Sequence, residues 1–423
     1  MSAAHTPVIL AAKRTPIGRF FGGLSKVPSP ILGSYAIRAV LESNPAIAAA
    51  AKGGVDEVVM GCVLQAGVGQ NPARQAALKA GLPDTQSAKT INKVCGSGLE
   101  AVMMAAQSIK AGDNELVIAG GLENMTAAPH FSRVREGVKY GPATMDDHMA
   151  YDGLRCAFEG WAMGNAADHI AKAHGISRAE QDRFSAQSHQ RAAAATSAGH
   201  FKNEIIALTG EQCMDKKSPG VSADEGIRGD STAESLAKLR PAFDKDGSVT
   251  AGNASQSSDG AAAVVVASHK KAEALGIKPV AKIVAYATSG IAPKDIFAAP
   301  IEGIRAVLAK ANLGVKDIDL FEINEAFAAQ VLCNIKALGV DESRLNICGG
   351  GIALGHPIGA SGARVLTTLI HQLHPTGGTR GGAERGSLQD GDHRPDRGAG
   401  RGQAVTGSCR CRGHRRGVAR REP

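Results

Sequence analysis

The chain has few aromatic residues and no apolar stretch long enough to cross a membrane. Phe, Trp and Tyr make up 4% of its 423 residues, with a single Trp. The longest apolar run, residues 261–267, is far shorter than the roughly 20 residues that a membrane-spanning helix needs. The apolar residues 7–12 come before Lys13 and Arg14, whereas a secretory signal places its basic residues first. We therefore expect no membrane partner and take the cytoplasm as the location.

Cysteine spacing and charge argue against further classes of function. The eight cysteines are widely scattered, and Cys409 and Cys411 lack zinc-knuckle spacing, so we expect neither a disulfide framework nor a metal site. The formal net charge is +8, but residues 381–423 hold ten Arg against five acids and contribute +5 of it. The other 380 residues carry only +3, which gives no argument for a nucleic acid partner.

Short apolar segments alternate with helical patterns along the chain. Residues 7–12, 56–64 and 116–121 have the apolar character of buried strands, and residues 98–110 have helical spacing between the last two. This alternation predicts an α/β fold with a parallel sheet.

The pattern is interrupted and then starts again. Residues 122–250 combine polar-faced helical segments with irregular stretches, and we interpret them as an insertion. Apolar strand character returns at 261–267. Residues 279–287 weakly echo residues 7–15, which is consistent with two copies of one α/β unit, although an echo this faint also arises by chance.

The sequence Val-Cys-Gly-Ser-Gly at 94–98 stands between a predicted strand and a predicted helix. A cysteine at a helix N-terminus lies beside unpaired backbone N–H groups and the positive end of the helix dipole, and both favour the nucleophilic thiolate. Cys95 is therefore a candidate nucleophile, although a buried structural cysteine fits this motif alone equally well. The pattern Gly-x-Gly-x-x-Ala at 96–101 also matches a dinucleotide-binding motif, but the strand before it is too polar for that reading.

Other polar motifs border predicted elements of the second half. Asn324 follows an apolar strand at 318–323, where open α/β sheets bind ligands, but an asparagine there also serves as a helix N-cap. His356 lies in a Gly- and Pro-rich loop before a helix at 363–373; it could act as acid, base or oxyanion donor, although most loop histidines are simply solvated. Small residues at 250–255 suit a narrow groove for an extended ligand, or a plain connecting loop.

Taken together, these motifs resemble the thiolase family. The strings NKVCGSGLEAV, LRPAF followed by TAGNAS, NEAFAAQ and GHPIGASGAR occur in the order and spacing typical of that family, up to about residue 380. The resemblance implies the α/β thiolase fold, with two stacked βαβαβαββ units and an inserted loop domain. It places the first unit at 1–121 plus 251–275, the loop domain at 122–250 and the second unit at 276–380.

The resemblance also implies an acetyl-CoA C-acyltransferase. Such an enzyme interconverts two acetyl-CoA, or acyl-CoA plus acetyl-CoA, with 3-oxoacyl-CoA plus CoA. Cys95 would carry the acyl group as a thioester, His356 would activate Cys95 and help to bind the thioester oxygen, and Asn324 would hold a water in an oxyanion hole. Coenzyme A thioesters would be the substrates, so no separate cofactor is expected. The resemblance also implies a homodimer or homotetramer. CoA would be bound by Leu154, Arg228, Ser235, Ala251, Ser255 and Phe327.

The chain departs from the family at two places. The His-Met-Gly of short-chain biosynthetic thiolases is replaced by Ala162-Met163-Gly164, which puts a strict acetoacetyl-CoA preference in doubt. Gly386 stands thirty residues after His356, where family members carry a second catalytic cysteine in a Cys-x-Gly-Gly-Gly segment. Cys348 precedes three glycines, but it lies before His356 and is not the matching residue.

Residues 376–423 have a composition unlike that of the rest of the chain. They contain twelve Gly, eleven Arg and one Leu, and no Lys, Ile, Phe, Tyr, Trp or Met. We interpret residues 381–423 as a disordered tail read out of frame from a GC-rich gene; an RG-rich arm that binds RNA is the alternative. We therefore expect the last two strands of the second unit to be missing and the condensation step to be lost.

Two other functions stay open at this point. One is a non-catalytic thiolase-like protein that binds acyl-CoA. The other is a ketoacyl-type condensing enzyme, which shares the fold; that group usually has a histidine where Asn324 stands, so the NEAF sequence argues against it.

Overall fold

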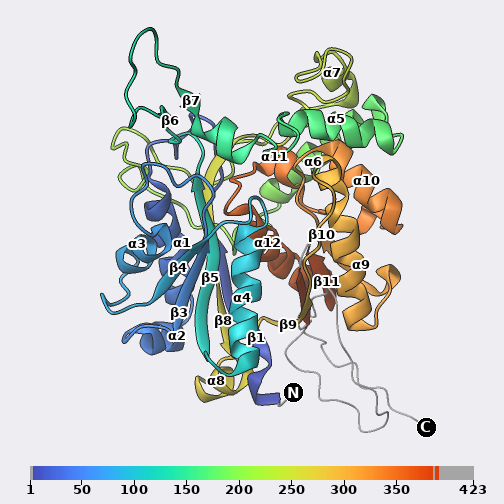
Figure 1. Ribbon diagram of the computed structural model, residues 1–423. Helices are drawn as coiled ribbons and strands as arrows, with labels where there is room; N and C mark the ends of the chain where they lie inside the picture. The colour runs from blue at the N-terminus through green and yellow to red at the C-terminus, as the bar shows by residue number, and fades with distance from the viewer. Residues whose placement is uncertain (1–2, 384–385, 390–423) are drawn as a thin grey trace, which may run out of the picture.

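One mixed sheet of ten strands runs through both halves of the protein (Figure 1). The computed structural model describes residues 3–383 and 386–389. The order of the sheet is β10-β11-β12-β9-β1-β8-β5-β3-β4, with β2 paired to β8, and β6 and β7 form a separate pair. The strands are β1 (Pro7–Arg14), β2 (Gly18–Arg19), β3 (Glu57–Gly61), β4 (Ala88–Ile91), β5 (Leu116–Asn124), β6 (His130–Phe131), β7 (Asp146–Asp147), β8 (Ser258–Ser268), β9 (Ala281–Tyr286), β10 (Leu320–Glu322), β11 (Arg380–Ala383) and β12 (Gly386–Gln389).

Helices lie in three layers around the two halves of this sheet (Figure 1). α1, α2 and α3 cover one face of the first half, α4 and α12 fill the space between the halves, and α9 and α10 cover the far face of the second half. No described helix is both long and apolar enough to span a membrane. The helices are α1 (Ser29–Glu42), α2 (Pro45–Ala51), α3 (Pro72–Lys79), α4 (Ser97–Ala111), α5 (Met163–Ala173), α6 (Arg178–Ser197), α7 (Ala233–Ala237), α8 (His269–Ala274), α9 (Ala299–Ala311), α10 (Ala328–Leu338), α11 (Gly351–Leu354) and α12 (Ser361–Thr376).

The two halves repeat one strand order. In the first half β1 pairs antiparallel with β8, β8 antiparallel with β5, and β5 parallel with β3. In the second half β9 pairs antiparallel with β12, β12 antiparallel with β11, and β11 parallel with β10. The halves join where Val8 and Ile9 of β1 pair with Lys282 and Ala281 of β9. The faint sequence echo therefore corresponds to the first strands of two equivalent units.

The central strands of the first half are buried on both faces. β5 and β8 are buried along their whole length, as expected for strands covered by helices on each side. β5 continues to Asn124, three residues beyond the predicted boundary of the unit at 121, and this extension places Glu123 inside the sheet. The chain between β5 and β8 holds α5, α6 and α7. A capping box of Ser177 and Glu180 starts α6.

β11 and β12 correct the expectation that the last two strands of the second unit are missing. Residues 380–383 run parallel to β10, and residues 386–389 lie between β11 and β9. Strand pairing uses backbone C=O groups and the N–H groups that every residue except proline supplies, so a glycine-rich segment with few apolar residues completes the ladder. The rest of the predicted tail, residues 384–385 and 390–423, lies outside the described residues.

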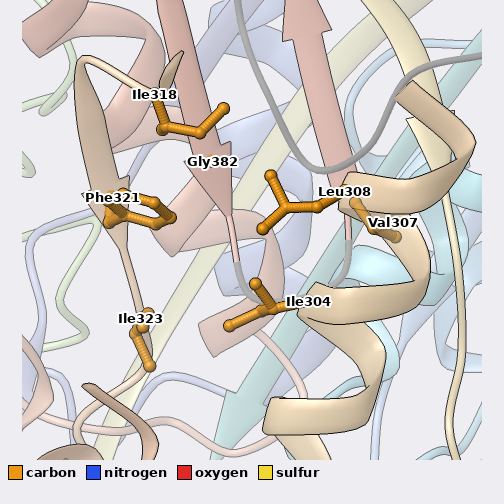
Figure 2. A pocket seen from close by; sticks show the side chains of 7 residues that line it. All are labelled: Ile304, Val307, Leu308, Ile318, Phe321, Ile323 and Gly382. Carbon is orange, nitrogen blue, oxygen red and sulfur yellow. The ribbon is translucent and has the colours of Figure 1, made fainter. Parts of the chain in front are cut away.

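The glycines of β11 complete the sheet but do not fill the core beside it. An apolar cavity lies between α9, β10 and β11, and Gly382 forms its wall on the β11 side (Figure 2). Figure 2 shows the side chains of α9 and of the β10 region pointing toward this space from opposite sides. The other lining residues are Ile304, Val307, Leu308, Ile318, Phe321 and Ile323.

Replacing Gly382 by valine should stabilise the protein. The new isopropyl group enters the cavity, and its burial is worth about 1–2 kcal/mol. Gly381→Val is the matched control, because neighbouring residues of a strand point to opposite faces and both changes remove the same glycine flexibility. In urea unfolding, the free energy of unfolding of Gly382→Val should exceed that of the control by this amount. Equal values for the two variants would show that the cavity does not limit the stability of this region.

Candidate active site

Cys95 lies in the tight turn that joins β4 to α4. The Ser97 hydroxyl accepts the Lys93 N–H at 2.8 Å and donates to the Val94 carbonyl at 2.6 Å, which closes the turn. Val94 has φ +48°, a left-handed conformation that β-branched residues rarely adopt. The turn leaves Cys95 half-buried, two residues before the first residue of α4.

His356 reaches Cys95 from the second half of the protein. Its Nε2 atom lies 3.2 Å from Cys95 Sγ, and its Nδ1 atom lies 2.5 Å from Ser361 Oγ. The Ser361 hydroxyl donates to the Pro357 carbonyl at 2.9 Å, so its oxygen is left to accept the Nδ1–H of the imidazole. This network assigns the tautomer whose Nε2 lone pair faces the thiol.

Burial holds the His356 side chain in its neutral form. It lowers the pKa of His356 to about 3, and the positive charge of Arg364 acts in the same direction. A neutral imidazole at physiological pH can accept a proton from Cys95, which an imidazolium cannot. The site therefore holds a thiol and a neutral imidazole at hydrogen-bond distance, which is the geometry that a nucleophile and its base require.

Asn324 completes a group of three residues that the sequence motifs had singled out separately. Its Nδ2 atom lies 3.4 Å from His356 Nε2, and Asn324 is the second residue after β10. The structure thus brings together Cys95, His356 and Asn324 from distant parts of the chain. An oxygen that developed next to Cys95 would lie close to His356 Nε2, and the Asn324 amide nitrogen lies 3.4 Å from that atom.

Further residues fix the backbone of the histidine loop. The His356 N–H is shared between the Gln256 carbonyl and the Ser258 hydroxyl, each at 3.1 Å. Gln256 Nε2 also donates to the carbonyls of Gly226 and Ile352. Sequence reasoning missed Ser361, Gln256 and Ser258; Ser361 stands five residues after His356 in the same motif and could have been suspected, whereas the other two carry no local signal.

An apolar wall surrounds the half-buried Cys95. Val63, Leu64, Met125 and Ile358 form a small buried cluster, and Cys95, Ala128, Met149 and Leu154 pack against it. A π-helix, Met149–Gly153, brings Leu154 to this wall. π-helical turns are rare and are frequent at functional sites.

The other predicted CoA-binding residues occupy different environments. Phe327 is buried, with its ring centroid 5.2 Å from that of Phe297, and the Ser255 N–H donates to the neighbouring Ala326 carbonyl at 2.9 Å. The remaining predicted residues are exposed on the surface. They are Arg228, Ser235 and Ala251.

The other described cysteines are buried. Burial raises the pKa of both Cys62 and Cys348, which keeps them as thiols. Cys348 Sγ lies 3.6 Å from His200 Nδ1, so its neighbour is a different histidine. Among residues 3–383 and 386–389 there is no group of three or more His, Cys, Asp or Glu side chains that could hold a metal ion.

Two equivalent α/β units that share one sheet, with a cysteine and a histidine where they meet, are the arrangement of the thiolase fold. The sequence matches the thiolase N-terminal domain over residues 7–270 and the thiolase C-terminal domain over residues 277–385. The chain therefore belongs to the thiolase family.

Individual relatives are similar over nearly the whole chain. An acetyl-CoA acetyltransferase of Chromobacterium violaceum is 52% identical over 375 residues, which is 88% of this chain and 94% of that protein. The acetyl-CoA acetyltransferase of Pseudomonas aeruginosa is 50% identical over 368 residues, 86% of this chain and 92% of that protein. The crystal structure of the Bacillus anthracis acetyl-CoA acetyltransferase has a TM-score of 0.85 at 39% identity, and covers 92% of this chain and 99% of that chain.

Ser361→Ala should slow the alkylation of Cys95 by iodoacetamide about tenfold, since proton transfer by a positioned base contributes at least that much. Without the serine oxygen, the imidazole proton is no longer held on Nδ1, and the tautomer with a proton on Nε2 cannot accept from the thiol. Thr367→Val is the control, because it also removes a buried hydroxyl of α12 that bonds a backbone carbonyl. Equal alkylation rates for the wild type and Ser361→Ala would exclude a role of Ser361 in setting the tautomer.

Proposed function

We propose that this chain is an acyl-CoA acyltransferase that carries the acyl group on Cys95. The observation that carries the proposal is the 3.2 Å approach of the neutral His356 Nε2 to Cys95 Sγ. Membership of the thiolase family and the names of the relatives support acetyl-CoA as the acyl donor. Acyl transfer between thioesters suits a soft sulfur nucleophile activated by an adjacent base.

In the first step, His356 Nε2 takes the proton of Cys95, and the thiolate attacks the thioester carbonyl of acyl-CoA. The carbonyl oxygen becomes an oxyanion, which donors near it stabilise by roughly 3–4 kcal/mol each. We assign this role to His356 and to a water held by Asn324. When the intermediate collapses, the C–S bond to CoA breaks, His356 returns its proton to the CoA sulfur, and Cys95 keeps the acyl group.

In the second step, a family member removes a Cα proton from acetyl-CoA, and the resulting carbon nucleophile attacks the acyl-cysteine to form 3-oxoacyl-CoA. The base for that proton is the second cysteine, and this chain has Gly386 where the family places it. Cys348 and Cys62 cannot replace it, because burial raises the pKa of each thiol. We therefore propose that acylation and its reversal by CoA persist here and that condensation is impaired.

Substrate binding is assigned from the family and from the site. We propose that Leu154 and Phe327 line the pantetheine path and that Arg228, Ser235, Ala251 and Ser255 bind CoA. Ala162 stands at the N-cap position of α5 in place of the usual histidine, and this replacement argues against a strict preference for acetoacetyl-CoA. We propose that the CoA thioesters are substrates and that no resident cofactor takes part. As the family resemblance implies, we propose a homodimer or homotetramer, located in the cytoplasm. A protein that binds acyl-CoA without reacting is the alternative.

Incubation of the chain with acetyl-CoA should acetylate Cys95 without forming acetoacetyl-CoA at a comparable rate. Intact-protein mass spectrometry follows the acyl-enzyme, and chromatography follows the condensation product. Cys95→Ser should abolish acylation, and Cys348→Ser should not, since that thiol is buried beside another histidine. Binding of acetyl-CoA without acetylation would favour the non-catalytic alternative. Acetoacetyl-CoA formation as fast as acylation would contradict the loss of the second base.

A further inference from the structure

The segment that carries His356 is held at both ends by buried carboxylates from opposite halves of the protein. At one end the Ile352 N–H donates to Glu325 Oε2 at 3.2 Å. At the other end the Gly359 N–H donates to Glu123 Oε2 at 2.9 Å. Glu123 and Glu325 are each about 1% exposed or less.

Glu123 gathers backbone donors from two different loops. Besides the Gly359 N–H, its carboxylate accepts the N–H of Val63 at 2.9 Å and that of Leu64 at 3.1 Å. The Cys62 thiol lies 3.6 Å from Glu123 Oε1. Val63 and Leu64 belong to the apolar wall against which Cys95 packs, so one carboxylate joins this wall to the histidine loop.

The groups around Glu123 suit an ionised carboxylate. Its contacts are donors, so both oxygens accept, and a hydrogen bond to an ionised group is about twice as strong as a neutral one. Burial raises the pKa of Glu123 to about 7, and the three N–H groups oppose this rise. A fully buried carboxylate is costly to keep, which makes a purely stabilising role a poor explanation for it.

The packing around Gly359 leaves the loop few other means of attachment. A Cβ atom on Gly359 would lie 2.6 Å from Glu123 Oε2 and 3.0 Å from Cys62 Cα. A Cβ atom on Gly98 of α4 would lie 3.1 Å from the Gly359 carbonyl oxygen. Side chains cannot enter such contacts, so hydrogen bonds of the backbone must set the position of this loop relative to α4 and Cys95.

We infer that Glu123 is a positioning residue that holds the His356 loop at reacting distance from Cys95. Its carboxylate ties Gly359 to Val63 and Leu64, and thereby sets the distance between His356 Nε2 and Cys95 Sγ. The expected effect on acylation rests on the proposed function. The effect of Glu123 on the cysteine–histidine pair can be tested by alkylation of Cys95, without any CoA substrate.

Glu123→Gln is the informative variant, because it keeps the size of the side chain. The amide offers one accepting oxygen in place of two. With that oxygen at the Oε2 position its NH₂ group faces the Leu64 N–H, and with the amide reversed it faces the N–H groups of Val63 and Gly359, so the link between the wall and the histidine loop is disturbed in either orientation. A displacement of about 1 Å at a reacting pair costs up to about 100-fold in rate. We expect the rate of Cys95 alkylation by iodoacetamide and the rate of acylation by acetyl-CoA to fall at least tenfold, with KM for acetyl-CoA within twofold of the wild-type value.

Asp56→Asn is the matched control, since Asp56 accepts two backbone N–H groups, those of Glu115 and Leu116, where β5 begins. It should leave both rates unchanged. Wild-type alkylation and acylation rates in a folded Glu123→Gln protein would overturn the inference. So would a rate loss accompanied by an equal rise in KM, which would indicate general disruption. If Glu123→Gln does not fold, Glu123→Asp replaces it, and unchanged rates in that shortened variant also count against the inference.

The two proposals fail in different ways. A wild-type protein that is alkylated at Cys95 but not acetylated by acetyl-CoA would refute the proposed function. The comparison of alkylation rates between the wild type and Glu123→Gln would still decide the role of Glu123 in that case.

Discussion

The close approach of α4 and α12 is the constraint on which the rest of the structure depends. A Cβ atom on Gly98 would lie 2.7 Å from the Ala363 nitrogen, and one on Gly362 would lie 2.5 Å from the Leu99 nitrogen. The two helix N-termini therefore touch through their backbones. Because Cys95 precedes one helix and His356 precedes the other, this contact between two halves of the chain creates the cysteine–histidine pair.

Buried charges occupy the space around this contact. Arg14 forms ion pairs with Glu204 and Asp224, and Arg364 lies 3.5 Å from Glu322. Burial raises the pKa of Glu322 to about 8, and the charge of Arg364 opposes the rise while it also helps to lower the pKa of His356. Compared with apolar residues of similar size, buried ion pairs add little to the stability of a fold. A buried charge without its partner, however, is strongly destabilising. These ion pairs therefore favour one arrangement of the two halves over others.

The second half shows how far backbone pairing alone can complete a fold. β11 and β12 occupy the positions that β5 and β8 hold in the first half, although β11 reads Arg-Gly-Gly-Ala where β5 reads Leu-Val-Ile-Ala. The backbone hydrogen bonds of a strand do not depend on which side chains it carries, but the packing of its side chains does. The cavity beside Gly382 lies where β11 has no side chain to fill the core. The inference from composition that these two strands would be absent was wrong.

The sequence by itself determined the family and the alternation of strands and helices, and it pointed to Cys95, Asn324 and His356 as candidate site residues, because each of these residues lies in a local motif with its own chemical signature. Only the tertiary structure decided which groups support them. Glu123, Gln256 and Ser258 lie far from His356 along the chain. No sequence pattern around a buried polar residue indicates which distant residue it will contact. Their contacts arise from the packing of two halves whose meeting point no local pattern encodes.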